Sequence, residues 1–317
     1  MQSDYLNKAL ATRDAFGDAI VDAAKKHKNI VLLGLDLSEA TRTEKFEKAF
    51  PERFFDMGIA EADGISTAAG MALEGDRPFI TSFASFLTGR YDQIRQSVAG
   101  NRAGVVLVGS HGGLAIGFDG NTQMGLEDIN LMRGLPFMNV IQPADYIEMY
   151  QAIMFLAKEK FPCYVRMCRQ PVPALNTLDY KFEFGKGVTL TKGNDLTIVA
   201  TGGVVYIAVE VAKELGKQGI KARVINIHTI KPLDQEIILK AAKETKGIIS
   251  IEDHNIIGGL GTAVAEVLAE AGSKVSFKRL GVPGFGESGK AADLYRKYEL
   301  DKEGILKNVK KFYTQIK

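Results

Sequence analysis

Short apolar runs alternate with longer segments of helical period in the first half of the chain. The runs are rich in Val, Ile and Leu, which is typical of strands buried on both faces of a parallel sheet. The segments between the runs repeat apolar residues every three to four positions, which predicts helices that cover the sheet. The predicted strands are residues 29–35, 78–83, 104–110, 138–143 and 162–168, and the predicted helices are residues 13–27, 61–74, 90–100, 126–133 and 144–158.

The alternation stops at residues 170–195, a stretch with two prolines, several Gly and Asn residues and no helical period, which is typical of a linker. It then resumes with predicted strands at 195–201, 222–227, 247–253 and 274–280, each followed by a predicted helix. The pattern predicts an α/β fold of two domains, each a mainly parallel sheet covered by helices. The predicted boundaries are residues 1–172 for the first domain, 173–189 for the linker and 190–317 for the second domain.

Polar and aromatic residues follow several predicted strands of the first domain. Asp36 follows the first strand, Phe83 and Phe86 the second, His111 the third and Arg169 the fifth. Taken singly, each has an ordinary structural explanation, such as core packing for Phe or a surface ion pair for Arg. Ligands of open parallel sheets bind outside the carboxyl ends of the strands, so together these residues predict a ligand site there.

Two further features carry candidate chemistry. Glu61 stands at the start of an apolar helix in MGIAEADGISTAAG, where it either complements the helix dipole or has a functional partner. The glycine-rich loop 109–125 is long enough to be functional, but it matches neither a Walker loop nor G-x-G-x-x-G. The glycines of GGLG, residues 258–261, fit either an anion site or a tight turn. No metal-ligand spacing is present, because the four histidines are scattered.

Composition narrows the class of protein. The 317 residues suffice for two domains, and the net charge of +2 gives no indication of a nucleic-acid partner. Only two cysteines occur, which indicates a reducing compartment rather than a disulfide framework. No signal-peptide pattern and no long apolar run is present, so we expect no membrane partner and a cytoplasmic location.

The motifs together resemble a known family. MGIAEADGISTAAGMALEG, ITSFASF, SHGGLAIGFDGNTQMGLEDINLMR and VIQPAD are similar to the C-terminal half of a transketolase, which is a pyrimidine-binding domain followed by a C-terminal domain. The resemblance covers essentially the whole chain. The β subunits of 2-oxo acid dehydrogenases and the synthases of deoxyxylulose phosphate share the same plan, so the family is better defined than the reaction.

The resemblance implies roles for the residues that would hold thiamine diphosphate. Glu61 would hydrogen-bond a ring nitrogen of the aminopyrimidine and so activate the cofactor, which makes it a catalytic residue. Phe86, with Phe83 beside it, would stack on the pyrimidine ring, and Asp36 would lie near the thiazolium.

The resemblance also implies substrate contacts. Arg13, His111 and Arg169 match positions that hold the phosphate of sugar phosphates, and His111 is also expected to be catalytic. Asp119 matches a residue that contacts a substrate hydroxyl. Gln123 stands where transketolases usually carry a histidine, and an amide cannot shuttle a proton near neutral pH. This departure leaves room for an unusual donor or acceptor sugar, and a sulfonate in place of the phosphate would fit the same arginines.

The family's magnesium and diphosphate site, a Gly-Asp-Gly followed by an asparagine pair, does not occur in the sequence. The resemblance therefore implies an N-terminal transketolase subunit as partner, which would supply the magnesium ligands in an α2β2 heterotetramer. The expected reaction is transfer of a two-carbon ketol unit from a ketose to an aldose that bears a phosphate-like anion. A 2-oxo acid dehydrogenase β-type subunit, a deoxyxylulose phosphate synthase-like enzyme and a non-catalytic scaffold or regulatory subunit remain as alternatives.

Overall fold

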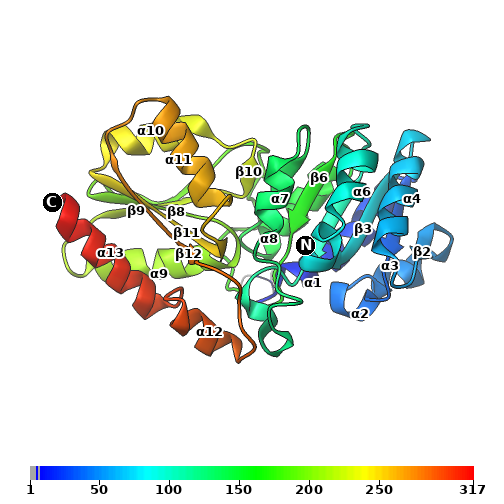
Figure 1. Ribbon diagram of the computed structural model, residues 1–317, viewed down its shortest axis with the longest axis horizontal. Coiled ribbons are helices and arrows are strands. Elements are labelled where there is room, and N and C mark those ends of the chain that lie inside the picture. Colours follow the sequence, from blue (N-terminus) through cyan, green and yellow to red (C-terminus); the bar gives the residue numbers. More distant parts are fainter. Residues whose placement is uncertain (1–4, 6–7) are drawn as a thin grey trace.

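The computed structural model describes Tyr5 and residues 8–317, which form two sheet-containing halves side by side (Figure 1). The strands are β1 (Ile30–Gly34), β2 (Phe54–Asp56), β3 (Arg77–Phe83), β4 (Val106–Ser110), β5 (Asn139–Ile141), β6 (Cys163–Arg166), β7 (Val188–Thr191), β8 (Leu196–Ala200), β9 (Ala222–Asn226), β10 (Thr229–Lys231), β11 (Gly247–Asn255) and β12 (Ser276–Val282).

Helices connect most of these strands. The α-helices are α1 (Thr12–Lys26), α2 (Ser38–Thr41), α3 (Glu44–Ala49), α4 (Glu61–Leu73), α5 (Ala84–Thr88), α6 (Tyr91–Gln93), α7 (Asp128–Gly134), α8 (Tyr146–Leu156), α9 (Val205–Gly216), α10 (Gln235–Glu244), α11 (Leu260–Glu270), α12 (Ala291–Lys297) and α13 (Lys302–Ile316). Short 3₁₀ turns are η2 (Pro51–Arg53), η4 (Leu114–Asp119) and η5 (Gly202–Val204), and η3 (Ile94–Ala99) is a π-helix that continues α6.

The first sheet has the strand order β10-β5-β6-β4-β3-β1-β2 and is parallel except for β10, which runs antiparallel to β5. β1, β3, β4 and β6 are buried at every position, as expected for central strands of a parallel sheet that is covered on both faces. Apolar side chains of α1 and α8 pack on one face of this sheet, and those of α4, α5 and α7 pack on the other. All the parallel strands therefore end at the same edge of the sheet.

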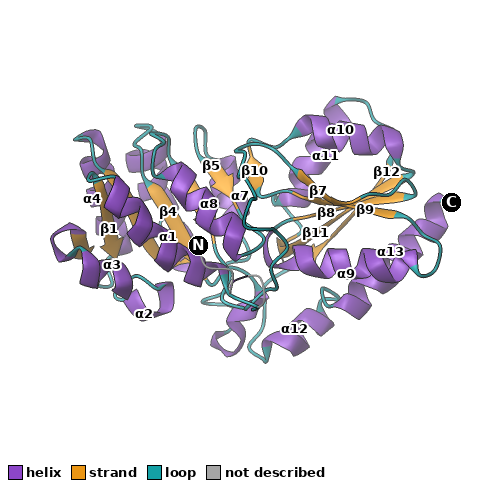
Figure 2. Ribbon diagram, turned by 180° about the vertical axis from the view of Figure 1, so that it is seen from behind, coloured by secondary structure: helices purple, strands orange, loops and turns teal. Residues whose placement is uncertain are grey.

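The second sheet has the order β12-β11-β8-β9-β7 and is parallel except for β7. α9 and α13 cover one face and α10 and α11 the other, which Figure 2 shows below and above the sheet. The predicted fold class, two α/β units with mainly parallel sheets, is confirmed.

Three short strands escape the sequence pattern. β7 lies at residues 188–191, so it begins inside the stretch whose composition predicts a linker. β2 and β10 have three residues each, too few to show a period of two. β10 belongs to the second half of the chain but adds the edge strand next to β5 of the first sheet, and thereby joins the two halves.

The predicted closing helix is in fact two helices, α12 and α13. Asp301 starts the second one, because its side chain accepts a hydrogen bond from the amide of Gly304. Within Tyr5 and residues 8–317, no helix has the length and apolar character needed to cross a membrane.

Candidate active site

An open depression of about 510 Å³ lies at the carboxyl ends of β1, β3, β4 and β6. The sequence motifs single out several residues for this edge of the sheet, and most of them meet here. The predicted site residues that line the depression are Arg13, Asp36, Phe83, His111, Asp119 and Arg169.

Arg13 reaches the depression from the first turn of α1. Its Nη1 donates a hydrogen bond to the carbonyl of Ala40, 3.0 Å away, in the short helix α2 that follows β1. This approach depends on Gly17, because a Cβ there would lie 2.6 Å from the carbonyl oxygen of Arg42. The buried Nε of Arg13 has no hydrogen-bond partner among the described residues.

His111 is buried beside Arg13 and has φ +58°, in the left-handed region. Arg13 Nη1 lies 3.3 Å from His111 Nε2, and because a guanidinium can only donate, Nε2 is the acceptor. The ring proton then sits on Nδ1 and is donated to the hydroxyl of Ser110 at 2.7 Å. Burial, followed by the charges of Arg13, Arg169 and Arg42, lowers the pKa of His111 from 6.5 to about 3. The imidazole is therefore neutral at physiological pH.

Aromatic rings form one wall of the site. Phe83 is the last residue of β3, and α5 begins immediately after it, which brings Phe86 within a stacked contact of 5.4 Å between ring centroids. The Phe83 centroid also lies 4.2 Å from that of His111. Phe83 is buried and lines the depression, whereas Phe86 is half-buried and does not.

Glu61 is the first residue of α4 and is 7% exposed. Its Oε2 lies 3.9 Å from Nη2 of Arg90, and within the described part of the chain its carboxylate accepts no hydrogen bond. Glu61 does not line the depression that contains His111. The carboxyl group of Glu61 is thus almost buried and is free to bond to a ligand. A glutamate that only complements the helix dipole does not need such an environment.

The acidic residues of the depression lie in loops. Asp36 is exposed at φ +57°, and its amide donates to Asp56 Oδ1 at 3.2 Å, so the turn after β1 is held by the side chain at the end of β2. Asp119 is also exposed, at the end of η4. Carboxylates of this kind can accept hydrogen bonds from the hydroxyl groups of a ligand.

The loop 111–125 contacts Arg169 and contains Gln123. Arg169 is exposed, and its Nη1 donates to the carbonyl of Ile116 at 3.1 Å. Gln123 is half-buried, and its backbone carbonyl accepts a hydrogen bond from the hydroxyl of Ser85 at 2.9 Å. Gln123 does not line the depression, so its proposed substrate contact stays a prediction.

Arg42 lines the depression as well and was missed by the sequence analysis. It sits at the end of α2 with φ +63°, and its Nε donates to Asp14 at 2.8 Å. No motif marks it, because its place in the site depends on the left-handed turn and on the contact with α1. The lining therefore carries three arginines and three acidic residues, Asp36, Glu39 and Asp119.

The GGLG glycines have a structural explanation. The side chain of Glu252 accepts hydrogen bonds from the amides of Leu260 and Gly261 at 2.7 and 2.8 Å, so the N-terminus of α11 already has a partner within the chain. His254, to which the sequence assigns no role, is buried and accepts from the amide of Asn130 at 3.4 Å. This contact joins the two halves of the chain.

Comparison with known proteins identifies the family. Residues 8–174 match the model of the transketolase pyrimidine binding domain, and residues 185–305 match that of the transketolase C-terminal domain. The chain belongs to the transketolase family. The resemblance predicted from the motifs is thereby confirmed, and the two halves of the fold are these two transketolase domains.

Similar proteins include separate C-terminal chains. The chain is 43% identical to the "Putative transketolase C-terminal section" of Methanocaldococcus jannaschii over 94% of each chain. It is 38% identical to the "6-deoxy-6-sulfo-D-fructose transketolase subunit SqwH" of Clostridium sp. strain MSTE9, over 93% of this chain and 92% of that one. The solved structure described as "Split gene transketolase, inactive beta4 tetramer" is 38% identical, with a TM-score of 0.89 and coverage of 98% and 100%.

Transketolase-family domains imply thiamine diphosphate as the cofactor, and the residues present fit its pyrimidine part. Glu61 offers a nearly buried carboxyl group with no hydrogen-bond partner among the described residues, which can share a proton with a ring nitrogen, and Phe83 and Phe86 offer a stacked aromatic face. Among Tyr5 and residues 8–317, no group of three His, Cys, Asp or Glu side chains is placed to hold a metal ion.

Proposed function

We propose that this chain is the C-terminal subunit of a two-chain transketolase. The complex would transfer a two-carbon ketol unit from a ketose to an aldose, and the sugars would carry a phosphate-like anion. Membership of the transketolase family by itself supports only a transferase of the transketolase type, to which we add the reaction, the class of sugar and the partner subunit.

The depression at the carboxyl ends of the first sheet carries this proposal. It combines three guanidinium groups, from Arg13, Arg42 and Arg169, with the exposed carboxylates of Asp36 and Asp119. Guanidinium groups bind phosphate and sulfonate oxygens with paired hydrogen bonds, whereas carboxylates accept from hydroxyl groups. A polyhydroxylated anion needs both, and a small 2-oxo acid does not. This favours a sugar phosphate or sugar sulfonate over the substrate of a 2-oxo acid dehydrogenase.

The residues of this chain would have distinct roles. Thiamine diphosphate, when bound, would supply the nucleophile for ketol transfer. Glu61 would hydrogen-bond the pyrimidine nitrogen, and the Phe83–Phe86 pair would orient the ring. His111, being neutral, would add no positive charge and would orient the guanidinium of Arg13 toward the substrate through Nε2.

The proposed partner is an N-terminal transketolase subunit that carries the diphosphate-binding domain and the magnesium ligands. The names of the relatives support it, since one is a "C-terminal section", one a "subunit" and one the product of a split gene. We propose an α2β2 assembly, with the cofactor between unlike chains, in the cytoplasm. The sulfofructose relative supports testing sulfonated as well as phosphorylated ketoses.

The first test is the native mass and the cofactor content of the complex purified from its own cells. A complex that contains an unlike chain, thiamine diphosphate and magnesium, and that transfers ketol units between sugar phosphates, is expected. A homo-oligomer that fails to bind added cofactor would instead indicate a scaffold or regulatory subunit. Turnover of a 2-oxo acid without turnover of ketoses would indicate one of the two related enzyme types.

The second test is Glu61→Ala in the assembled complex. We expect kcat for ketol transfer to fall about 100-fold or more, because the variant removes the group that activates the cofactor. The matched control is Asp63→Asn, which removes an exposed charge from the same turn of α4. Full activity of a normally assembled Glu61→Ala complex would refute the proposed activation.

A further inference from the structure

The loop 111–125 joins β4 to α7 and positions several groups of the proposed substrate site. His111 begins it, and Asp119 ends η4 within it. The carbonyl of Ile116, also in η4, holds the guanidinium of Arg169. The path of this one loop therefore determines where a carboxylate and a guanidinium of the depression point.

The C-terminal half of the chain holds this loop at both ends of η4. At its start, the amide of Leu114 donates to Asp253 Oδ1 at 2.9 Å. Near its end, the hydroxyl of Ser288 donates to the carbonyl of Phe118 at 2.6 Å, and the amide of Gly289 lies 3.4 Å from the carbonyl of Gly117. Figure 1 shows the same arrangement, with the segment between cyan and green beside α12.

Asp253 connects the loop to α12. It lies two residues before the end of β11 and is 5% exposed, and its Oδ2 accepts a hydrogen bond from the hydroxyl of Tyr295. A buried carboxylate is stable only when its oxygens have donors, so Leu114 and Tyr295 each satisfy one side of it. Tyr295 thereby fixes the carboxylate that fixes the loop.

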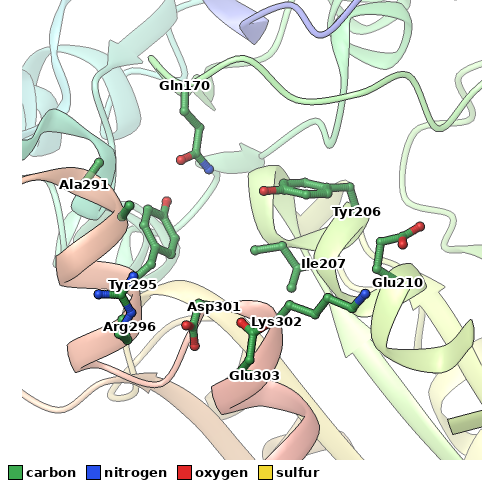
Figure 3. A pocket seen from close by; sticks show the side chains of 11 residues that line it. Gln170, Tyr206, Ile207, Glu210, Ala291, Tyr295, Arg296, Asp301, Lys302 and Glu303 are labelled. Atoms are coloured by element: carbon green, nitrogen blue, oxygen red, sulfur yellow. The ribbon is translucent and has the colours of Figure 1, made fainter. Parts of the chain in front are cut away.

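Tyr295 stands on one wall of a cleft of about 390 Å³ between α9, α12 and α13. Figure 3 shows it on α12, facing Tyr206 of α9 across the cleft. The two tyrosines border the same space, but of the two only Tyr295 donates to Asp253. They therefore make a matched pair for mutagenesis.

We infer that Asp253 and Tyr295 are positioning residues for the substrate site of the first domain. They hold the start of η4 so that Asp119 and Arg169 face the same depression. The kinetic consequence rests on the proposed function, whereas the anchoring of the loop does not. The C-terminal domain then contributes to the site although none of its residues lines the depression.

The kinetic test compares Tyr295→Phe with Tyr206→Phe in the complex with the N-terminal subunit. For Tyr295→Phe we expect KM for a phosphorylated ketose to rise about fivefold, the effect of losing one hydrogen bond. We expect kcat and thiamine diphosphate affinity to stay within about twofold, because Glu61 and Phe86 lie on α4 and α5. Tyr206→Phe should change none of these values.

Two Asp253 variants and one double variant test whether Tyr295 acts on KM through Asp253 and the loop. Asp253→Ala should raise KM more than Asp253→Asn, because the amide oxygen of asparagine still accepts from Leu114. In an Arg169→Ala background, Tyr295→Phe should have a smaller effect on KM, since both changes act through the same loop.

Hydrogen exchange of the purified full-length chain tests the anchor without any assay of activity. Amides of residues 113–120 should exchange faster in Tyr295→Phe and Asp253→Ala than in the wild type or in Tyr206→Phe. Unchanged exchange together with unchanged KM would overturn the inference. A fall in kcat and in cofactor affinity that accompanies the rise in KM would overturn it as well, because it indicates general damage. If the wild-type complex turned over no ketose, the proposed function would be wrong. The exchange rates would still show whether Asp253 and Tyr295 hold the loop 111–125.

Discussion

At the scale of single residues, the positive charge of the depression comes from its arginines, because His111 is neutral. Arg13, Arg42 and Arg169 line it, and their charges add to burial in keeping His111 neutral. An imidazole between arginines can accept from one of them, as Nε2 does from Arg13, without adding a fourth positive charge. In the proposed anion site, the affinity would therefore come from the guanidinium groups.

Arg169 is the arginine most accessible to a ligand, since it is exposed and held only by the carbonyl of Ile116 among the described residues. Arg169→Ala should raise KM for phosphorylated sugars by roughly 10- to 100-fold, the equivalent of one charge-assisted hydrogen bond. Arg169→Lys should be intermediate, because lysine keeps the charge but loses the planar fork. Steady-state kinetics with a phosphorylated and a non-phosphorylated ketose measure this. Equal effects on both ketoses would remove Arg169 from the anion site.

His111 should make the folded chain sensitive to acid. Its pKa is lowered from 6.5 to about 3 in the folded state, so below pH 6.5 the unfolded chain takes up a proton that the folded chain excludes. His111 therefore does not reduce the free energy of unfolding above pH 6.5. Below that value the free energy of unfolding falls by about 1.4 kcal/mol per pH unit.

The matched variant is His111→Asn, whose amide can still donate to Ser110 but does not titrate. Urea unfolding at pH 7 and at pH 5 should show that the wild type loses about 2 kcal/mol more of its free energy of unfolding than the variant does. Parallel losses in the two proteins would show that His111 is protonated in the folded chain at pH 5.

At the scale of elements, the loop 111–125 is shaped by how closely it approaches the second domain. Gly113 has φ +91°, and a Cβ there would collide with the carboxylate of Asp253. The loop is also closed on itself, since the amide of Gly113 donates to the carbonyl of Gly125 at 2.8 Å. Any side chain at residue 113 would push η4 away from β11.

Gly113→Ala should therefore lower the free energy of unfolding by about 2 kcal/mol or more, through left-handed strain and the collision. Gly134→Ala is the control, because this residue ends α7 and a Cβ there meets nothing within 4 Å. Alanine at such a helical position should be neutral or stabilising by up to about 1 kcal/mol. Denaturant unfolding compares the two, and equal stabilities would contradict the proposed close approach.

At the scale of the whole molecule, buried polar groups tie the two domains together. Glu148 of α8 is fully buried and accepts from Asn226 of β9 at 2.9 Å and from Tyr180 of the connecting segment at 2.8 Å. Burial, with Asp145 nearby, raises the pKa of Glu148 to about 7. The apolar clusters are also shared, since Phe83 and Leu114 of the first domain pack with α9 and α13 of the second. The C-terminal domain is therefore part of the framework of the site.

The order of strands and helices could be predicted from the sequence, because the periods of apolar residues are local properties of the chain. Strands such as β1 and β4 and helices such as α4 and α8 lie where the pattern predicts them. The motifs around Glu61 and His111 sufficed to predict the transketolase family and its two domains. The short strands β2 and β10 could not be predicted, because neither lies in a longer apolar run, whereas the equally short β5 lies within the predicted strand 138–143.

By itself, then, the sequence determined the α/β class, the family and most of the residues that meet at the end of the first sheet. Only the tertiary structure decided which distant side chains touch. It placed Arg42 in the depression through a left-handed turn and the contact with Asp14. It joined Leu114 to Asp253, 139 positions away along the chain. Such pairs are set by the packing of one domain on the other, and packing depends on shape and burial that no local period records.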